Sequence, residues 1–230
     1  MRRRLTGLLA CGISFTAATS GHDVITTPIT FSREISRLVY AHCARCHRPG
    51  GAAFSLMTYA AARPWAAAIK EEVLERRMPP WGAVKGFGEF KDNQGLTQEQ
   101  IELIADWVEG GAPEGDPKLL PKLPKFTEIR PPRVQSAIPV EGARTLRTGI
   151  SLAGIQPQKV LDRGSVMVTA TRPDGSIEPL LWLYNYSAKF PHIYWYKAEL
   201  HLPAATKIEV TPPGAATVAL VIRRPRAHLP

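Results

Sequence analysis

Apolar residues recur at spacings of three and four between about Phe31 and Pro113, which is the period of one face of an α-helix. The first such run carries the apolar face Phe31, Ile35, Leu38, Val39 and His42. It predicts a helix with Ser32 as its N-cap, because a serine hydroxyl can accept from the free amides of the first turn. This helix runs directly into a pair of cysteines.

Two further helices are expected in the same half of the chain. The second follows Pro64, a residue suited to a first helical turn, and must end before Pro79. The third begins with a capping box in which Thr97 caps and Gln100 reaches back, and it ends at Gly110. The expected buried faces are Trp65, Ala68, Ile69 and Val73 in the second helix, and Ile101, Ile104, Ala105 and Val108 in the third.

The pattern changes twice in the second half. Residues 113–139 are rich in proline and lysine without a helical period, which indicates an extended linker. From about residue 146, short β-branched and aromatic runs separated by turn residues predict strands over 165–171, 179–184, 193–196, 207–211 and 216–222. The expected fold is therefore multidomain α plus β: an N-terminal all-α domain followed by a small antiparallel β-sandwich-like domain.

The first residues, MRRRLTGLLACGISFTAATSG, combine a basic start, an apolar stretch and small residues. This order is typical of a secretory signal peptide, here residues 1–20, so we expect a periplasmic or otherwise exported protein. An alternative is a lipoprotein, because Leu8 to Cys11 resembles a bacterial lipoprotein cleavage box and would place a lipid anchor at Cys11. No other segment is long and apolar enough to cross a membrane, so the mature chain is expected to have no transmembrane segment.

The formal charge of the chain is +9, from 29 basic and 20 acidic residues. Without the three arginines of the leader, the mature chain has 26 basic residues against 20 acidic ones, or about +6. A moderately basic surface can attract acidic partner proteins. No basic cluster is interleaved with aromatic residues, so nucleic acid is not an expected partner.

Three cysteines are present, and removal of the leader takes away Cys11. The remaining pair, Cys43 and Cys46, excludes a framework of structural disulfides. At the end of a helix their thiols share a face and can both reach the two vinyl groups on one edge of a haem. His47 then lies below the ring, with an imidazole nitrogen toward the iron, so Cys-x-x-Cys-His predicts covalent attachment of one haem c.

Two other chemistries use cysteine pairs. Zinc needs four ligands, and the other histidines show no ligand-like spacing: His22, His42, His192, His201 and His228. A thiol–disulfide switch expects the strand-to-helix setting of thioredoxin, whereas this motif ends an amphipathic helix. Export also favours haem, because bacteria attach haem covalently outside the cytoplasm.

The haem iron has a second axial position, which a thioether would fill in an electron-transfer cytochrome. Met78 is the first candidate, because Pro79 and Pro80 stiffen the backbone that follows it. Met57 is the reserve candidate, and an open five-coordinate iron is the third option. Met167 falls in a predicted strand.

Weaker roles are assigned to residues around the motif. The turn Pro49-Gly50-Gly51 can bring a carbonyl, such as that of the proline, to accept the N–H of His47. Arg63, Trp65 and Trp81 could donate to the haem propionates, although the tryptophans could equally be packed in the core.

Several motifs occur in one order: Cys43 to Gly51, Phe54 to Tyr59, Ala62 to Lys70, Arg76 to Trp81, Leu96 to Ile101 and Trp107 to Asp116. Together they resemble a bacterial monohaem cytochrome c domain of the CxxCHRPGG and MPPW type. The resemblance implies a cytochrome c-like haem domain over residues 28–116, with His47 and Met78 as iron ligands. Residues 117–145 would be the linker, and 146–225 a β-rich domain of unknown role.

In many relatives, such a domain precedes a module similar to copper type II ascorbate-dependent monooxygenases. Residues 164–210 faintly resemble part of that module, but the chain has no His-His or His-x-His sequence for copper, which makes copper unlikely.

The expected function is that of an exported one-electron carrier for redox partner proteins rather than a catalyst. The alternatives are an electron-feeding or degenerate subunit of a copper monooxygenase-like enzyme, or a binding module that uses the aromatic run 182–196.

Overall fold

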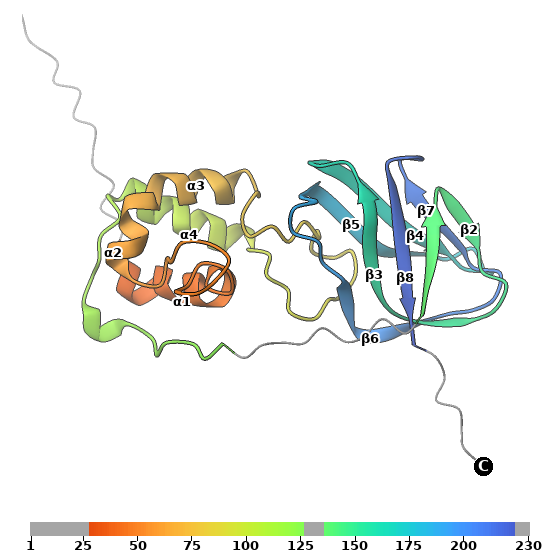
Figure 1. The fold of residues 1–230 in the computed structure, drawn as a ribbon, viewed down its shortest axis with the longest axis horizontal. Helices are drawn as coiled ribbons and strands as arrows, with labels where there is room; N and C mark the ends of the chain where they lie inside the picture. The colour runs from red at the N-terminus through yellow and green to blue at the C-terminus, as the bar shows by residue number, and fades with distance from the viewer. Residues whose placement is uncertain (1–27, 127–135, 224–230) are drawn as a thin grey trace, which may run out of the picture.

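The computed structural model describes residues 28–126 and 136–223 of the chain. Short helices gather at one end and two β-sheets at the other, with an irregular loop between them (Figure 1). The expected signal peptide and Cys11 lie outside the described residues.

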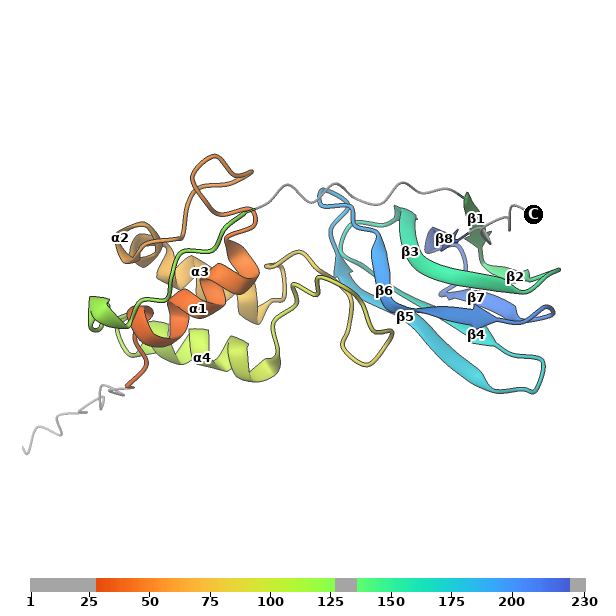
Figure 2. The same cartoon turned by 90° about the horizontal axis from the view of Figure 1, so that it is seen from below.

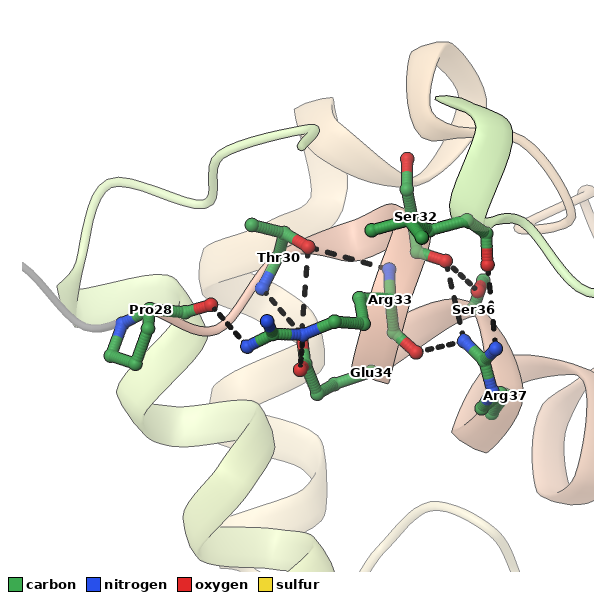
Figure 3. A network of polar contacts seen from close by, with 8 residues as sticks. Pro28, Thr30, Ser32, Arg33, Glu34, Ser36 and Arg37 are labelled. Atoms are coloured by element: carbon green, nitrogen blue, oxygen red, sulfur yellow. Dashed lines mark hydrogen bonds and ion pairs between the residues drawn. The ribbon is translucent and has the colours of Figure 1, made fainter. Parts of the chain in front are cut away.

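One continuous helical segment leads to the cysteine motif. It consists of α1 (Ser36–Leu38) between two π-helical turns, η1 (Phe31–Ile35) and η2 (Val39–Cys43). Its N-cap is Thr30 and not the expected Ser32: the Thr30 hydroxyl accepts from the Arg33 amide at 3.3 Å, and the Glu34 carboxylate accepts from the Thr30 amide at 2.8 Å (Figure 3). Ser32 cannot cap, because it is fully buried one residue inside the helix.

The other helical elements are short. They are α2 (Tyr59–Ala62), η3 (Arg63–Trp65), α3 (Ala66–Leu74), α4 (Gln98–Glu109) and η4 (Pro117–Leu119). The capping box of Thr97 and Gln100 at the start of α4 is confirmed. The expected buried face of α3 is partly wrong, because Trp65 and Ala68 are exposed and Ala66 is buried instead. The 3₁₀ turn over η3, with three residues per turn, shifts the helical register at this point.

In the described part of the chain, eight strands form two four-stranded antiparallel sheets. The first has the order β1 (Ser136–Glu141), β8 (Ala216–Ile222), β3 (Ile150–Val160), β6 (Tyr194–Leu202). The second has the order β2 (Ala143–Thr145), β7 (Lys207–Thr211), β4 (Gly164–Thr171), β5 (Ile177–Tyr186). Apolar side chains of both sheets share one core.

Three of these strands have no counterpart in the sequence pattern. β1 and β2 lie in the stretch that its prolines and lysines marked as linker. β3 contains Gly154 and Pro157, residues that normally interrupt strands, and irregularities in its pairing with β8 accommodate them.

The loop between α3 and α4, residues 75–97, joins the helices to the sheets (Figure 2). It lies along β5 and β6, each of which is one of the two edge strands of its sheet. The amide of Val84 donates to the carbonyl of Trp182 on β5 at 2.9 Å, and the amide of Lys91 donates to the carbonyl of Trp195 on β6 at 2.7 Å. The α3–α4 loop therefore pairs with an edge of each sheet.

Two aromatic residues of this loop are part of the sandwich core. Trp81 and Phe90 are 6% and 4% exposed, and both pack against Tyr194 of β6, at ring-centroid distances of 5.0 and 5.5 Å. The core of the β-sheets is thus completed by residues that precede their contact Tyr194 by more than a hundred positions in the sequence.

The expected fold class, with a self-contained all-α N-terminal cytochrome c-like domain, is wrong. The described chain is mainly antiparallel β-sheet, its helices are short, and the long loop after α3 belongs to the β core as much as to the helices. The physical reason lies in that loop. Its prolines and glycines cannot continue a helix, and its apolar side chains find their burial against β5 and β6.

The close approach of the loop to β5 predicts a large effect at Gly88. This residue has φ +90°, and a Cβ there would lie 2.5 Å from the carbonyl oxygen of Leu180. Gly86 in the same loop has φ +89° but open space around it, so Gly86→Ala is expected to cost only the left-handed strain, about 1 to 2 kcal/mol. Gly88→Ala should cost a further 1 kcal/mol or more, roughly the penalty of overpacking. Urea unfolding midpoints of the two variants would measure the difference, and equal midpoints would contradict the close approach.

Candidate functional site

The cysteine motif forms one tight turn at the end of the first helix. Cys43 is the last residue of η2, and its carbonyl accepts from the amides of Cys46 at 3.1 Å and of His47 at 2.9 Å. Both cysteines are free thiols and both are half-buried. The structure therefore brings the three sequence-predicted residues Cys43, Cys46 and His47 together in one turn.

The chain then reverses and runs back along the motif. The amide of Ala53 donates to the carbonyl of Cys46 at 3.1 Å, and the amide of Leu56 donates to the carbonyl of His47 at 3.1 Å. Gly51 is required inside this reversal, because a Cβ there would collide with the carbonyl of Cys46. The turn that the sequence indicated at Pro49 to Gly51 thus reverses the chain, and the segments before and after it are joined by backbone hydrogen bonds.

The reversal orients the imidazole of His47. Its Nδ1 lies 2.9 Å from the carbonyl oxygen of Phe54, which is the acceptor in place of the expected proline carbonyl. Because a carbonyl can only accept, Nδ1 is the donor in this contact, and Nε2 is the nitrogen left for a ligand. An imidazole with one nitrogen fixed by a backbone carbonyl is the usual arrangement of a histidine that ligates a metal.

The electrostatics of the cysteine pair distinguish between chemistries. Burial raises the pKa of the Cys43 thiol to about 12, and the neighbouring Cys46 contributes in the same direction. Cys43 is therefore protonated at neutral pH. A redox-active cysteine reacts as the thiolate, which the burial of Cys43 disfavours.

An exposed aromatic stack lies beside His47. The ring of Phe54 is 5.0 Å from the imidazole and 4.5 Å from the indole of Trp65, between centroids. Phe54 and Trp65 are 49% and 46% exposed, and Arg63 is also exposed. Trp65 is therefore available to a ligand next to the motif and does not belong to the protein core.

Met78 lies on a cavity of about 750 Å³ between the helices and β5. Trp81, Leu96 and Trp182 also line this cavity, whereas Cys43, Cys46 and His47 do not. Met57, the other candidate, is a buried core residue, 8% exposed.

The helix that carries the cysteines contacts the same cavity-lining segment. His42, next to Cys43, bonds through Nδ1 to the carbonyl of Gln94 at 3.1 Å, and its Nε2 lies 3.3 Å from the side-chain amide of Gln100. Gly95 and Leu96, which line the cavity, follow directly. Gly95 and Leu96 thus follow a residue bonded to His42 and line the same cavity as Met78.

Trp81, which lines the cavity, has a polar group without a hydrogen-bond partner. Its indole Nε1 is buried and has no hydrogen-bond partner. A Cβ at Gly95 would lie 3.1 Å from Cδ1 of Trp81, so the pyrrole edge of the indole faces the cavity-lining segment. A buried N–H without an acceptor is costly, and a ligand oxygen would satisfy it.

Sequence reasoning missed His192 and Tyr194, which had appeared only as an isolated histidine and a strand residue. His192 Nε2 lies 2.8 Å from the carbonyl of Pro80, and the Tyr194 hydroxyl donates to the carbonyl of Trp81. Burial lowers the pKa of His192, the bond to Pro80 raises it, and the charge of Arg45 lowers it. Arg45 lies between the two cysteines in the sequence.

Across residues 28–126 and 136–223, no group of three or more His, Cys, Asp and Glu side chains is arranged to hold a metal ion. Within the same ranges, none of the helices has the length and apolar character required to cross a membrane.

Comparison with known protein-family models, curated proteins and solved structures finds no match for this chain.

Proposed function

We propose that the protein is an exported monohaem c-type cytochrome that carries one electron at a time between redox partner proteins. The observation that carries the proposal is the turn Cys43 to His47, in which two thiols and an imidazole with a free Nε2 are presented together. Haem c supplies an iron that is reduced and reoxidised by one electron.

The chain's residues fit the attachment chemistry. Each thiol would add its S–H across one vinyl group, with sulfur on one carbon and hydrogen on the other, so no oxidant is needed. The carbonyl of Phe54 holds the His47 ring, and its Nε2 would ligate the iron of a bound haem.

The remaining assignments concern the sixth iron ligand, the haem propionates and the redox partner. Met78, on the cavity wall, is proposed as the sixth ligand, ahead of the buried Met57. The unpartnered indole N–H of Trp81 suits a propionate oxygen, and Trp65 with its exposed face is the second donor. The excess of basic over acidic residues suits an acidic redox partner.

The proposal is tested on the full chain, produced in an exporting host that has the c-type maturation system. A pyridine haemochrome spectrum should show covalent haem, and the intact mass should exceed that of the polypeptide by one haem. Peptide mapping should find the added mass on the peptide that contains Cys43 and Cys46. A colourless protein with the bare polypeptide mass would refute the proposal.

Substitution of the sixth ligand gives a separate test. Met78→Ala should abolish the weak far-red band that reports methionine–iron bonding in the ferric protein, because the thioether sulfur is removed. Haem content should stay unchanged, since the thioethers and His47 remain. Met57→Ala is the matched control and should keep the band. The reverse result, with the band lost only in Met57→Ala, would reassign the ligand.

A further inference from the structure

Residues 117–126, which we call the basic strap, follow the helical part of the chain and run past α1 toward the sheets (Figures 1 and 2). The strap begins with η4, whose N-cap Asp116 accepts from the amide of Lys118 at 2.9 Å. Beyond η4 it has neither helix nor strand, because Pro121 and Pro124 lack the backbone N–H that either structure needs.

The basic strap concentrates exposed apolar side chains. The described residues contain eleven large apolar side chains that are exposed, and four of them lie within these ten positions: Leu119, Leu120, Leu123 and Phe126. Single apolar residues on a surface are ordinary, but a cluster of them marks a contact with a partner or a membrane.

The charged side chains of the basic strap are all positive. Lys118, Lys122 and Lys125 are exposed, and no acidic residue lies between Asp116 and Glu128 in the sequence. The strap therefore offers apolar groups and positive charge on one segment.

The end of the basic strap contacts the turn that carries the cysteines. The guanidinium carbon of Arg48 lies 4.2 Å from the ring centroid of Phe126, and Arg48 directly follows His47. A cation over an aromatic face is attracted to it, so this contact holds the strap beside the cysteine–histidine turn. At the other end, Arg37 of α1 donates to the carbonyl of Leu119 at 3.4 Å.

We propose that the basic strap binds a membrane surface that contains anionic lipid. Its lysines are attracted to negative headgroups, and its leucines and phenylalanine enter the boundary between headgroups and acyl chains. A protein partner would need pockets shaped to four side chains of an irregular segment, whereas a fluid lipid boundary accommodates them in any arrangement. The inference goes beyond the proposed function, and it would bring the turn from Cys43 to His47 close to a membrane.

Both contributions to binding have an expected size. One lysine near an anionic surface strengthens binding by about five-fold, so three lysines together contribute roughly 100-fold. Transfer of an exposed leucine side chain from water to the lipid boundary contributes about ten-fold.

The chain offers a matched control for the charge. One variant carries Lys→Gln at the three strap lysines. The control carries the same change at three exposed lysines outside the strap, so both variants lose three positive charges: Lys91, Lys159 and Lys189. Every protein also carries Cys11→Ala, so that a lipid on this cysteine cannot supply the attachment.

A second pair of variants tests the apolar contribution. Leu123→Asn changes a strap leucine that is 66% exposed, and Leu161→Asn changes a leucine between β3 and β4 that is 73% exposed. Because both side chains are exposed, both variants should keep the thermal unfolding midpoint of the parent protein, which circular dichroism measures.

Vesicle sedimentation of the full chain from the exporting host, at low ionic strength, measures binding. The vesicles contain phosphatidylcholine alone or phosphatidylcholine mixed with phosphatidylglycerol. We expect binding to be about 100-fold tighter with phosphatidylglycerol, and the strap lysine variant to lose most of this difference while its control loses less than about five-fold. Leu123→Asn should bind about ten-fold more weakly, and Leu161→Asn should bind like the parent.

Each outcome decides the inference. Absence of binding to the phosphatidylglycerol vesicles would refute it, and so would equal losses in the two lysine variants, because net charge would then explain the binding. If Leu123→Asn bound as tightly as the parent, insertion into lipid would be wrong, and an acidic protein would become the expected partner of the strap. Haem content is measured on the same samples: a colourless protein that binds vesicles through the strap refutes the proposed function alone.

Discussion

Replacement of both Cys43 and Cys46 by alanine is expected to give a colourless protein from a host that loads the wild type with haem. Each thioether needs its own sulfur, and imidazole ligation by His47 alone holds haem reversibly. Each single variant should retain one thioether, and its haemochrome band should lie at longer wavelength than that of the wild type. Absorption spectra and intact masses of the three variants measure the effect.

The third cysteine supplies the control for this experiment. Cys11→Ala should leave the haem content of the exported protein at the wild-type level, because no second cysteine or histidine accompanies Cys11. Wild-type haem content in the double variant would contradict the assignment of the attachment site. Equal loss of haem in Cys11→Ala would instead identify a defect in export as the cause of the loss.

The second large effect is expected at Trp81. This side chain is 6% exposed and packs against Phe90 and Tyr194, so Trp81→Ala would leave a cavity inside the sandwich. Deletion of a buried aromatic ring typically costs about 3 to 5 kcal/mol. We expect urea unfolding to show a loss of this size, with the fluorescence and circular dichroism transitions remaining coincident.

Trp65→Ala removes the same amount of side chain from an exposed position. Trp65 is 46% exposed and stacks on Phe54, so its loss should cost about 1 kcal/mol, the worth of an aromatic pair. If the two tryptophan variants were equally stable, the α3–α4 loop would not belong to the core of the sheets.

Several features could be predicted from the sequence because they depend on residues that are close together in it. Thr97 and Gln100 are three apart before an apolar period, and they form the capping box because both partners of the bond lie within one helical turn. The turn at Cys43 to His47 is likewise closed by bonds between near neighbours. The acceptor for His47 also lies nearby, although the residue turned out to be Phe54.

Features that depend on contacts between residues far apart in the sequence could not be predicted from local patterns. Trp81 and Phe90 fit a helical domain as well as a sheet, and only the free edges of β5 and β6 draw them into the sandwich. β3 is interrupted by Gly154 and Pro157, and its place between β8 and β6 overrides that local signal. The expectation of an all-α domain was wrong for this reason: a local pattern shows that a side chain is apolar, but it does not show which element will bury it.

The amino-acid order alone therefore accounts for the cysteine–histidine turn, the capping box of Thr97 and Gln100 and most strands, since their hydrogen bonds and alternations span only a few residues. The folded chain adds the junction between helices and sheets, and with it the contacts of His192 and Tyr194 to the Met78 turn. Those contacts join residues more than a hundred positions apart, and burial against a common core brings them together.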